Sequence, residues 1–167
     1  MHSLPQLILT MRLTRFSDIG LRVLIYLARA GEDRAPATVA EIAQQFDIPA
    51  NHLVKVVGQL ARAGWVKAMR GRNGGLTLNA DPKTLRIGVV LRELEGDGEL
   101  VDCETGGCQL RGDCLLRAAL AVGKNAFYDA MDRYALADIT TGAVGEQIVM
   151  MHRNFIRTSK ETKPELA

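Results

Sequence analysis

The feature that most constrains this chain is a short segment, residues 101–117, which holds all three cysteines of the 167 residues. Cys103, Cys108 and Cys114 follow the spacing C-x4-C-x5-C, and glycines between them let the backbone fold tightly around a small object. Thiolates are soft ligands that select zinc, copper(I) or an iron–sulfur cluster. Structural zinc sites and the common iron–sulfur clusters take four ligands, so a metal site here receives a fourth ligand from elsewhere or stays open and reactive. The alternative is three unrelated thiols, or a disulfide plus a spare thiol. The charged, glycine-bearing surroundings favour the metal site.

The remaining composition is that of an ordinary cytoplasmic domain. Hydrophobic residues make up 47% and charged residues 24% of the chain, and no apolar run approaches the ~20 residues that cross a membrane. The apolar stretch at residues 4–11 has neither a basic start nor a small-residue cleavage site, so we do not expect a signal peptide. An odd cysteine count without export signals indicates a reducing cytoplasm. Residues 1–80 hold ten basic against five acidic side chains and residues 81–137 hold seven against ten, which suggests nucleic-acid contact by the first part and sensing by the second.

The N-terminal half has the pattern of a winged helix-turn-helix. Apolar spacing and breaker residues predict helices over residues 14–29, 38–47 and 50–63, and strands over residues 65–69 and 75–79. Thr38 and Glu41 form a capping box at the start of the second helix, and Gly64 ends the third. We therefore expect a mainly α protein with a winged helix-turn-helix DNA-binding domain over residues 11–80.

Polar and basic side chains lie on the third predicted helix and in the loop between the two predicted strands. We expect the helix to enter the major groove of double-stranded DNA through Asn51, His52, Lys55 and Gln59. The basic loop adds Arg70 and Arg72, which suit contacts with phosphates or the minor groove. Any surface helix has a polar face, so the order of the elements, a helix-turn-helix followed by a basic hairpin, carries this prediction.

The second part, residues 81–137, is expected to hold the cysteine loop and a dimerisation helix. A short helix over residues 87–95 precedes the cysteines, and a long helix runs from Leu115 to about Ala137. Its apolar stripe is too long for so small a domain to cover, so we expect the same helix of a second chain to cover it in a two-fold homodimer. The stripe comprises Leu116, Ala119, Leu120, Gly123, Phe127, Ala130, Met131 and Tyr134. Residues 1–10 and 140–167 are expected to be poorly defined extensions.

Together these segments resemble the family of iron–sulfur transcriptional regulators that contains IscR and the nitric-oxide-sensing NsrR repressors. The resemblance covers residues 11–138 and rests on Met11-Arg-Leu-Thr-Arg-Phe-Ser-Asp18, Arg70-Gly-Arg-Asn-Gly-Gly-Leu76, Leu91-Arg-Glu-Leu-Glu-Gly96 and the cysteine segment. It implies a homodimer with one cluster per chain near the base of the long helix. IscR-like members carry a histidine three residues after the last cysteine and hold a [2Fe–2S] cluster. Here that position is Arg117, a permanent cation that cannot ligate, so the resemblance is better to NsrR, which carries [4Fe–4S].

The resemblance also implies the fourth ligand. From residue chemistry alone, Asp18 is a helix-dipole partner that pairs with Arg22 one turn further on. The resemblance instead makes Asp18 from the partner subunit a ligand beside Cys103, Cys108 and Cys114. In this interpretation nitric oxide attacks the cluster, the ligands are lost, and the dimer releases its DNA.

Other classes of protein remain as alternatives. One is an iron–sulfur regulator that responds to oxygen or to cluster supply, with [2Fe–2S] as the alternative cluster. Another is a DNA-binding protein with a structural zinc. We do not expect an enzyme, because the chain has no Cys-x-x-Cys pair and its histidines, His2, His52 and His152, lie far from the cysteines in sequence.

Overall fold

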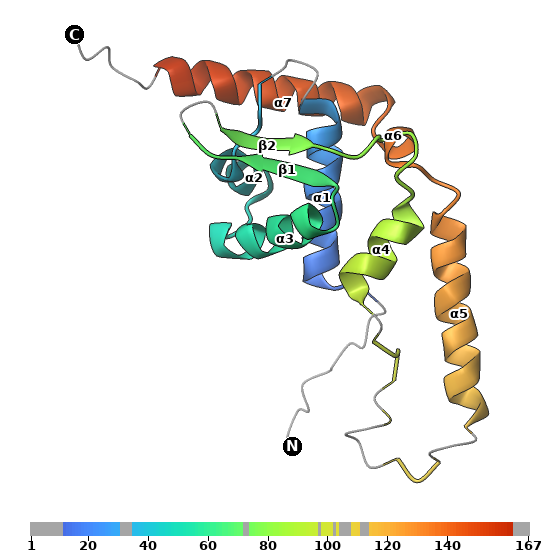
Figure 1. The fold of residues 1–167 in the computed structure, drawn as a ribbon. Helices are drawn as coiled ribbons and strands as arrows, with labels where there is room; N and C mark the ends of the chain where they lie inside the picture. The colour runs from blue at the N-terminus through green and yellow to red at the C-terminus, as the bar shows by residue number, and fades with distance from the viewer. Residues whose placement is uncertain are drawn as a thin grey trace, which may run out of the picture.

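The fold is organised around one central helix. The structure, a computed structural model, describes residues 12–30, 35–71, 74–96, 98–101, 103, 108–110 and 114–161. Helix α1 (Arg15–Ala30) runs through the middle of the molecule, with a helix-turn-helix and a β-hairpin on one side and two further helices on the other (Figure 1). The mainly helical winged-helix fold predicted from the sequence is thereby confirmed.

The helix-turn-helix and the wing form from the local signals in the sequence. Helix α2 (Val39–Phe46) begins with the predicted capping box: the Glu41 N–H donates to Thr38 Oγ1 at 3.1 Å, and the Thr38 N–H donates to Glu41 Oε2 at 3.2 Å. Helix α3 (Ala50–Arg62) follows, and strands β1 (Val66–Met69) and β2 (Gly75–Leu78) pair antiparallel with Val66 opposite Leu78. Ala37 forms an isolated bridge to Leu76, which fixes the hairpin to the chain just before α2.

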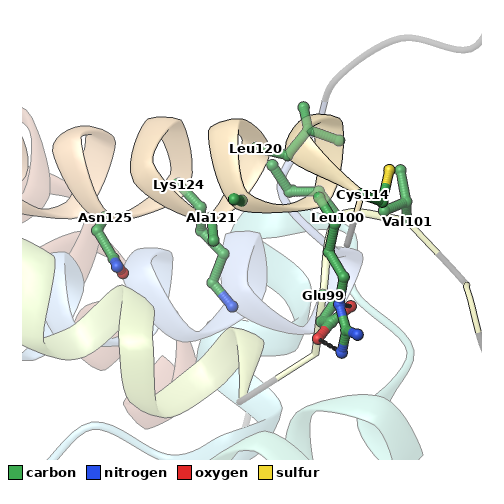
Figure 2. A pocket seen from close by; sticks show the side chains of 10 residues that line it. Glu99, Leu100, Val101, Cys114, Leu120, Ala121, Lys124 and Asn125 are labelled. Atoms are coloured by element: carbon green, nitrogen blue, oxygen red, sulfur yellow. Dashed lines mark hydrogen bonds and ion pairs between the residues drawn. The ribbon is translucent and has the colours of Figure 1, made fainter. Parts of the chain in front are cut away.

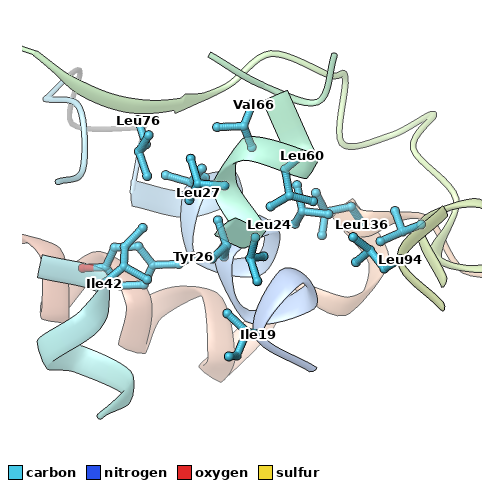
Figure 3. Close-up of a cluster of buried hydrophobic side chains, with 14 of the residues drawn as sticks. Ile19, Leu24, Tyr26, Leu27, Ile42, Leu60, Val66, Leu76, Leu94 and Leu136 are labelled. Carbon is cyan, nitrogen blue, oxygen red and sulfur yellow. The ribbon is translucent and has the colours of Figure 1, made fainter. Parts of the chain in front are cut away.

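The core lies where α1 meets these elements (Figure 3). Fully or almost fully buried side chains come from α1, α2, α3 and both strands, and include Leu24, Leu27, Ile42, Leu53, Leu60, Val66 and Leu76. Burial of each such side chain contributes about 1.5–3 kcal/mol. The position of α3, and therefore of any surface that it presents, depends on this shared core.

Helix α4 (Ile87–Glu95) packs between α1 and helix α5 (Leu115–Met131). A Cβ atom at Gly88 would lie 2.2 Å from the Tyr128 carbonyl oxygen, so only glycine lets the two helices approach this closely. Arg92 adds two ion pairs of 2.6 Å, to Asp129 and to Asp132. Helix α5 is thus attached to the rest of the chain mainly through α4, and its N-terminal end extends away from the core (Figure 1).

The long helix ends earlier than predicted. It stops at Met131 rather than near Ala137, and residues 136–139 form the separate short helix α6 (Leu136–Ile139). The cause is pairing with a distant segment: the Ile87 N–H donates to the Tyr134 carbonyl, and the Leu136 N–H donates to the Leu85 carbonyl, both at 2.9 Å. These non-local hydrogen bonds outweigh the local helical preference.

The C-terminal extension differs most from its prediction. Residues expected to be poorly defined form the 20-residue helix α7 (Gly142–Glu161), which packs against α1. Ile148 and His152 are buried there, and together with Ile156 they recur at the four-residue spacing of a helix face. None of the helices within the described part of the chain has the length and apolarity to cross a membrane.

Candidate metal centre and nucleic-acid interface

The three cysteines lie on the connection between α4 and α5. Cys114 is the N-cap residue of α5, so its sulfur lies at the positive end of the helix dipole, which favours anionic groups. Cys103 and Cys108 come from the preceding segment, and all three side chains are half-buried, with no disulfide among them. Among the described residues of this single chain, no group of three His, Cys, Asp or Glu side chains is arranged to hold a metal ion.

Charged neighbours and partial burial both act on Cys103. Partial burial raises the pKa of the Cys103 thiol, negative charge on Cys108 raises it further, and Arg117 opposes the shift. Three soft sulfurs suit zinc or an iron–sulfur cluster in ligand type. They supply three of the four ligands that such groups take, so the donor set fits a cluster that has a fourth ligand from outside this segment.

Two contacts attach the start of the cysteine segment to α5, and Figure 2 shows the one at Glu99. Arg117 forms an ion pair with both carboxylate oxygens of Glu99, and this cation lowers the pKa of the Glu99 carboxyl. About two turns further along, Lys124 Nζ donates to the Gly98 carbonyl at 2.6 Å. A pocket of about 420 Å³ lies between residues 99–101 and this face of α5, with Cys114 at its edge. These contacts fix the segment that leads into Cys103 relative to the helix that begins at Cys114.

Asp18 lies on α1, in the first turn of the helix. Its side chain is 49% exposed, and Arg22 Nε donates to both carboxylate oxygens at 3.0 and 3.1 Å. An exposed i,i+4 pair of this kind stabilises a helix by only about 0.3–0.5 kcal/mol. The carboxylate is therefore accessible to another partner, and the Arg22 contact is weak enough to be exchanged for one.

Helix α3 presents its outer face away from the core. Asn51, His52 and Lys55 are exposed as predicted, opposite the buried side chains of Leu53, Val56, Val57 and Leu60. Sequence reasoning missed Val54, which is 57% exposed between them. An exposed valine is detectable only by its position in the helical period, because its residue type points to the core.

Gln59, the fourth predicted contact on α3, also has partners within the chain. Its Nε2 donates to Glu93 Oε1 of α4 at 2.5 Å, and its Oε1 accepts from Arg62 Nε at 3.2 Å. Both ends of the amide are thus engaged within the chain, at the junction between α3 and α4. Its partner lies 34 positions along the sequence, so no local pattern indicated the contact.

The wing exposes two cations in the described residues, Lys67 on β1 and Arg70. Arg70 follows β1 and is exposed, in the position expected of a phosphate contact. Arg72, the second predicted wing residue, lies outside the described residues.

Helix α4 joins the two candidate sites. Its last turn reaches α1, where Glu95 Oε1 accepts from the Thr14 N–H at 2.9 Å, and α3, where Glu93 accepts from Gln59. Its other face packs on α5 through Gly88 and Arg92. The chain then continues from α4 into the cysteine segment.

Comparisons with known proteins agree with this arrangement. The family model Rrf2, described as an iron-dependent transcriptional regulator, matches residues 13–142. A Listeria innocua protein described as a transcriptional regulator is 29% identical, with a TM-score of 0.63 over 79% of this chain and 88% of that chain. CymR, the global cysteine regulator of B. subtilis, is 25% identical, with a TM-score of 0.61 over 78% and 96% of the two chains. IscR of T. potens shares the fold at 18% identity, with a TM-score of 0.61 over 94% of each chain.

Proposed function

This chain belongs to the Rrf2 family of DNA-binding transcriptional regulators, and from that premise we propose that it is a homodimeric, cytoplasmic repressor that senses nitric oxide through one [4Fe–4S] cluster per chain. Members of the family are regulators of transcription and not enzymes, in agreement with the prediction from the sequence. The family includes iron–sulfur regulators. The observation that carries the finer proposal is the placement of all three cysteines on the segment that directly follows α4, the helix that contacts α1, α3 and α5.

The residues proposed to hold the cluster are Cys103, Cys108 and Cys114 of one chain and Asp18 of the partner subunit. The three sulfurs leave one ligand position to be filled, and Asp18 is an accessible carboxylate with only a weak, exchangeable contact to Arg22. A bound iron–sulfur cluster would supply iron centres that react with nitric oxide. A carboxylate is a hard ligand beside soft sulfurs, so we expect its bond to be the most easily lost.

The chain transmits the loss of these ligands through α4. Release of the cysteine segment frees the C-terminal end of α4, where Glu93 holds Gln59 and Glu95 holds the Thr14 N–H. Release of Asp18 frees α1, which shares its core with α3. In a two-fold dimer the two recognition helices must lie about one turn of DNA apart. A shift of α1 and α4 therefore removes several phosphate and base contacts at once.

The dimer interface is proposed to be the outer face of α5. Leu116 is 63% exposed, and Val122 and Phe127 are also exposed although they are large and apolar. Helix α5 buries Tyr128 against α4, while the opposite face carries these side chains into solvent in the single chain. A second copy of α5 would cover them by two-fold symmetry.

An anaerobic preparation tests this function. The protein purified without oxygen should be brown, with about four iron and four sulfide ions per chain for one [4Fe–4S], and should retard a duplex selected from a random DNA pool. Addition of nitric oxide should abolish the retardation. Cys108→Ala should give colourless protein with weak DNA affinity.

The same preparation distinguishes the alternatives. Two iron and two sulfide ions per chain would indicate [2Fe–2S], and zinc without colour would indicate a structural site. A cluster that releases DNA on exposure to oxygen, but not to nitric oxide, would keep the iron–sulfur regulator and contradict the proposed signal.

A further inference from the structure

The outer face of α3 contains an apolar residue that the fold does not use. Val54 is 57% exposed and lies at the edge of the exposed face, three residues before the buried Val57. Its neighbours on the exposed face are Asn51 and Lys55. The helix therefore has a small exposed hydrophobic spot beside its polar side chains, in the part of the protein that a helix-turn-helix inserts into the major groove.

One turn further on, the same face carries a glycine that the fold does not require. A Cβ atom at Gly58 would meet only Arg62 Nη1, at 3.7 Å, which is an ordinary contact, and Gly58 has no left-handed backbone conformation that would favour glycine. A glycine inside a helix is less favourable than alanine. The described contacts of the chain do not require the missing side chain, and its absence leaves room for close approach of a ligand to the helix backbone.

We propose that Val54 reads the 5-methyl group of a thymine in each half-site of the operator, and that Gly58 lets the backbone of α3 come close enough for that contact. In the major groove, thymine differs from cytosine by its methyl group and by its O4 acceptor, and apolar side chains recognise the methyl. Asn51 and Lys55, which lie beside Val54 on the exposed face, supply the polar contacts to adjacent base edges and phosphates. This inference rests on the proposed binding of DNA through α3.

Removal of one methyl group from the DNA tests the contact at the level of atoms. After selection of a duplex from a random pool, each thymine is replaced in turn by deoxyuridine, which lacks only the 5-methyl group. At one position per half-site the wild-type affinity should fall by about fourfold, the effect of one buried methyl group. Val54→Ala should bind the thymine duplex that much more weakly and be indifferent to deoxyuridine at this position.

Two further variants complete the design. Val144→Ala changes an equally exposed valine on α7 and should keep both the affinity and the thymine preference. Gly58→Ala should raise the melting temperature, because alanine favours the helix, and yet weaken DNA binding severalfold, because its methyl group holds the DNA away.

The outcomes separate this inference from the function on which it rests. A protein that selects a duplex but shows no thymine at which deoxyuridine matters, or a Val54→Ala variant that keeps the wild-type preference, overturns the role of Val54. A Gly58→Ala variant with wild-type affinity overturns the close approach. A protein that selects no duplex at all contradicts the proposed DNA binding as well.

Discussion

At the scale of single residues, the most consequential feature is a buried polar network that joins three helices. His152 of α7 is 0% and Glu41 of α2 is 1% exposed. His152 Nδ1 lies 2.5 Å from Glu41 Oε1, and its Nε2 lies 3.1 Å from the Ala35 carbonyl oxygen. A carbonyl only accepts, so Nε2 carries a proton. Tyr26 of α1 donates to the same carboxylate oxygen at 2.6 Å.

The first prediction concerns the loss of one partner from this network. His152→Ala leaves Glu41 buried without its counter-group and opens a cavity beside α1, so the free energy of unfolding should fall by about 3–5 kcal/mol. Chemical denaturation measures this fall in the free energy of unfolding. Asn154→Ala, an exposed change on the same helix, is the matched control and should stay within about 0.5 kcal/mol. Equal stability of the two variants would show that α7 does not hold the helix-turn-helix.

The second prediction concerns alkaline pH. Burial, and then the hydrogen bond to Glu41 and its negative charge, raise the pKa of the Tyr26 phenol well above its ordinary value. A group whose pKa is raised in the folded state stabilises the fold fully below its unfolded pKa, which is about 10 for tyrosine, and this stabilisation is lost as the pH rises further. Above pH 10 we therefore expect the unfolding free energy to decrease by up to about 1.4 kcal/mol per pH unit from this residue.

Tyr26→Phe isolates that contribution. The variant should be less stable than the wild type at neutral pH because it lacks the hydrogen bond, and its stability should decline less steeply above pH 10. Tyr128 also has a raised pKa from burial, so the informative quantity is the difference between the two slopes. Parallel curves would show that Tyr26 does not titrate in this way.

At the scale of the elements, α4 is the connection between the cysteines and the recognition helix. Gln59 of α3 donates to Glu93 of α4, whereas its residue type and exposed neighbours had predicted a contact with a base. The two roles have different consequences for Glu93. If Gln59 contacts only DNA, Glu93 has no effect on recognition, but if Gln59 links α3 to α4, both residues act together.

The third prediction uses this difference. Gln59→Ala and Glu93→Ala should each reduce the effect of nitric oxide on DNA affinity, and the double variant should be no worse than either single one. Glu93→Gln keeps a hydrogen-bond acceptor and should retain the wild-type response, which excludes removal of charge as the cause. Additive effects in the double variant would return Gln59 to the predicted base contact.

Local sequence signals were sufficient to predict the winged helix-turn-helix. The capping box of Thr38 and Glu41, the apolar spacing of α1 and α3, and the basic hairpin all form as predicted, because each depends on residues near one another in sequence. The end of α5 was missed because hydrogen bonds between residues 85–87 and 134–136 form only in the folded chain. Helix α7 was missed because its key inward residue is the polar His152, whose partner lies 111 positions away.

The same distinction applies to the candidate sites. The grouping of Cys103, Cys108 and Cys114 indicated a metal site directly, since the residue type carries the chemistry. Val54 escaped notice because an apolar residue in a helix normally belongs to the core, and only its measured exposure shows otherwise. The pairing of Asp18 with Arg22 was predictable from i,i+4 spacing and is present, whereas a contact between two chains has no signature in the order of residues.

At the scale of the whole molecule, the proposed sensor is built from two chains. Each chain offers three sulfurs on one side of α4 and a carboxylate on α1, and each recognition helix shares a core with the α1 that bears Asp18. If the carboxylate binds the cluster of the partner subunit, every cluster holds in place the α1 and the recognition helix of the other chain. Loss of either cluster then disturbs the contacts with both half-sites. The release of DNA therefore depends steeply on the concentration of nitric oxide.

A heterodimer measures this central claim most directly. One chain carries Asp18→Ala and the other carries Cys103→Ala, Cys108→Ala and Cys114→Ala, each with a different affinity tag, so that only mixed dimers are purified, without oxygen. The only cysteine set is then in the chain that lacks Asp18, and ligation across the dimer predicts one cluster per dimer with the spectrum and nitric-oxide reaction rate of the wild type. The Asp18→Ala homodimer should assemble some cluster on three thiolates, with an altered nitric-oxide response and altered DNA affinity. A heterodimer that behaves like this homodimer would contradict the claim that Asp18 reaches the cluster of the partner subunit.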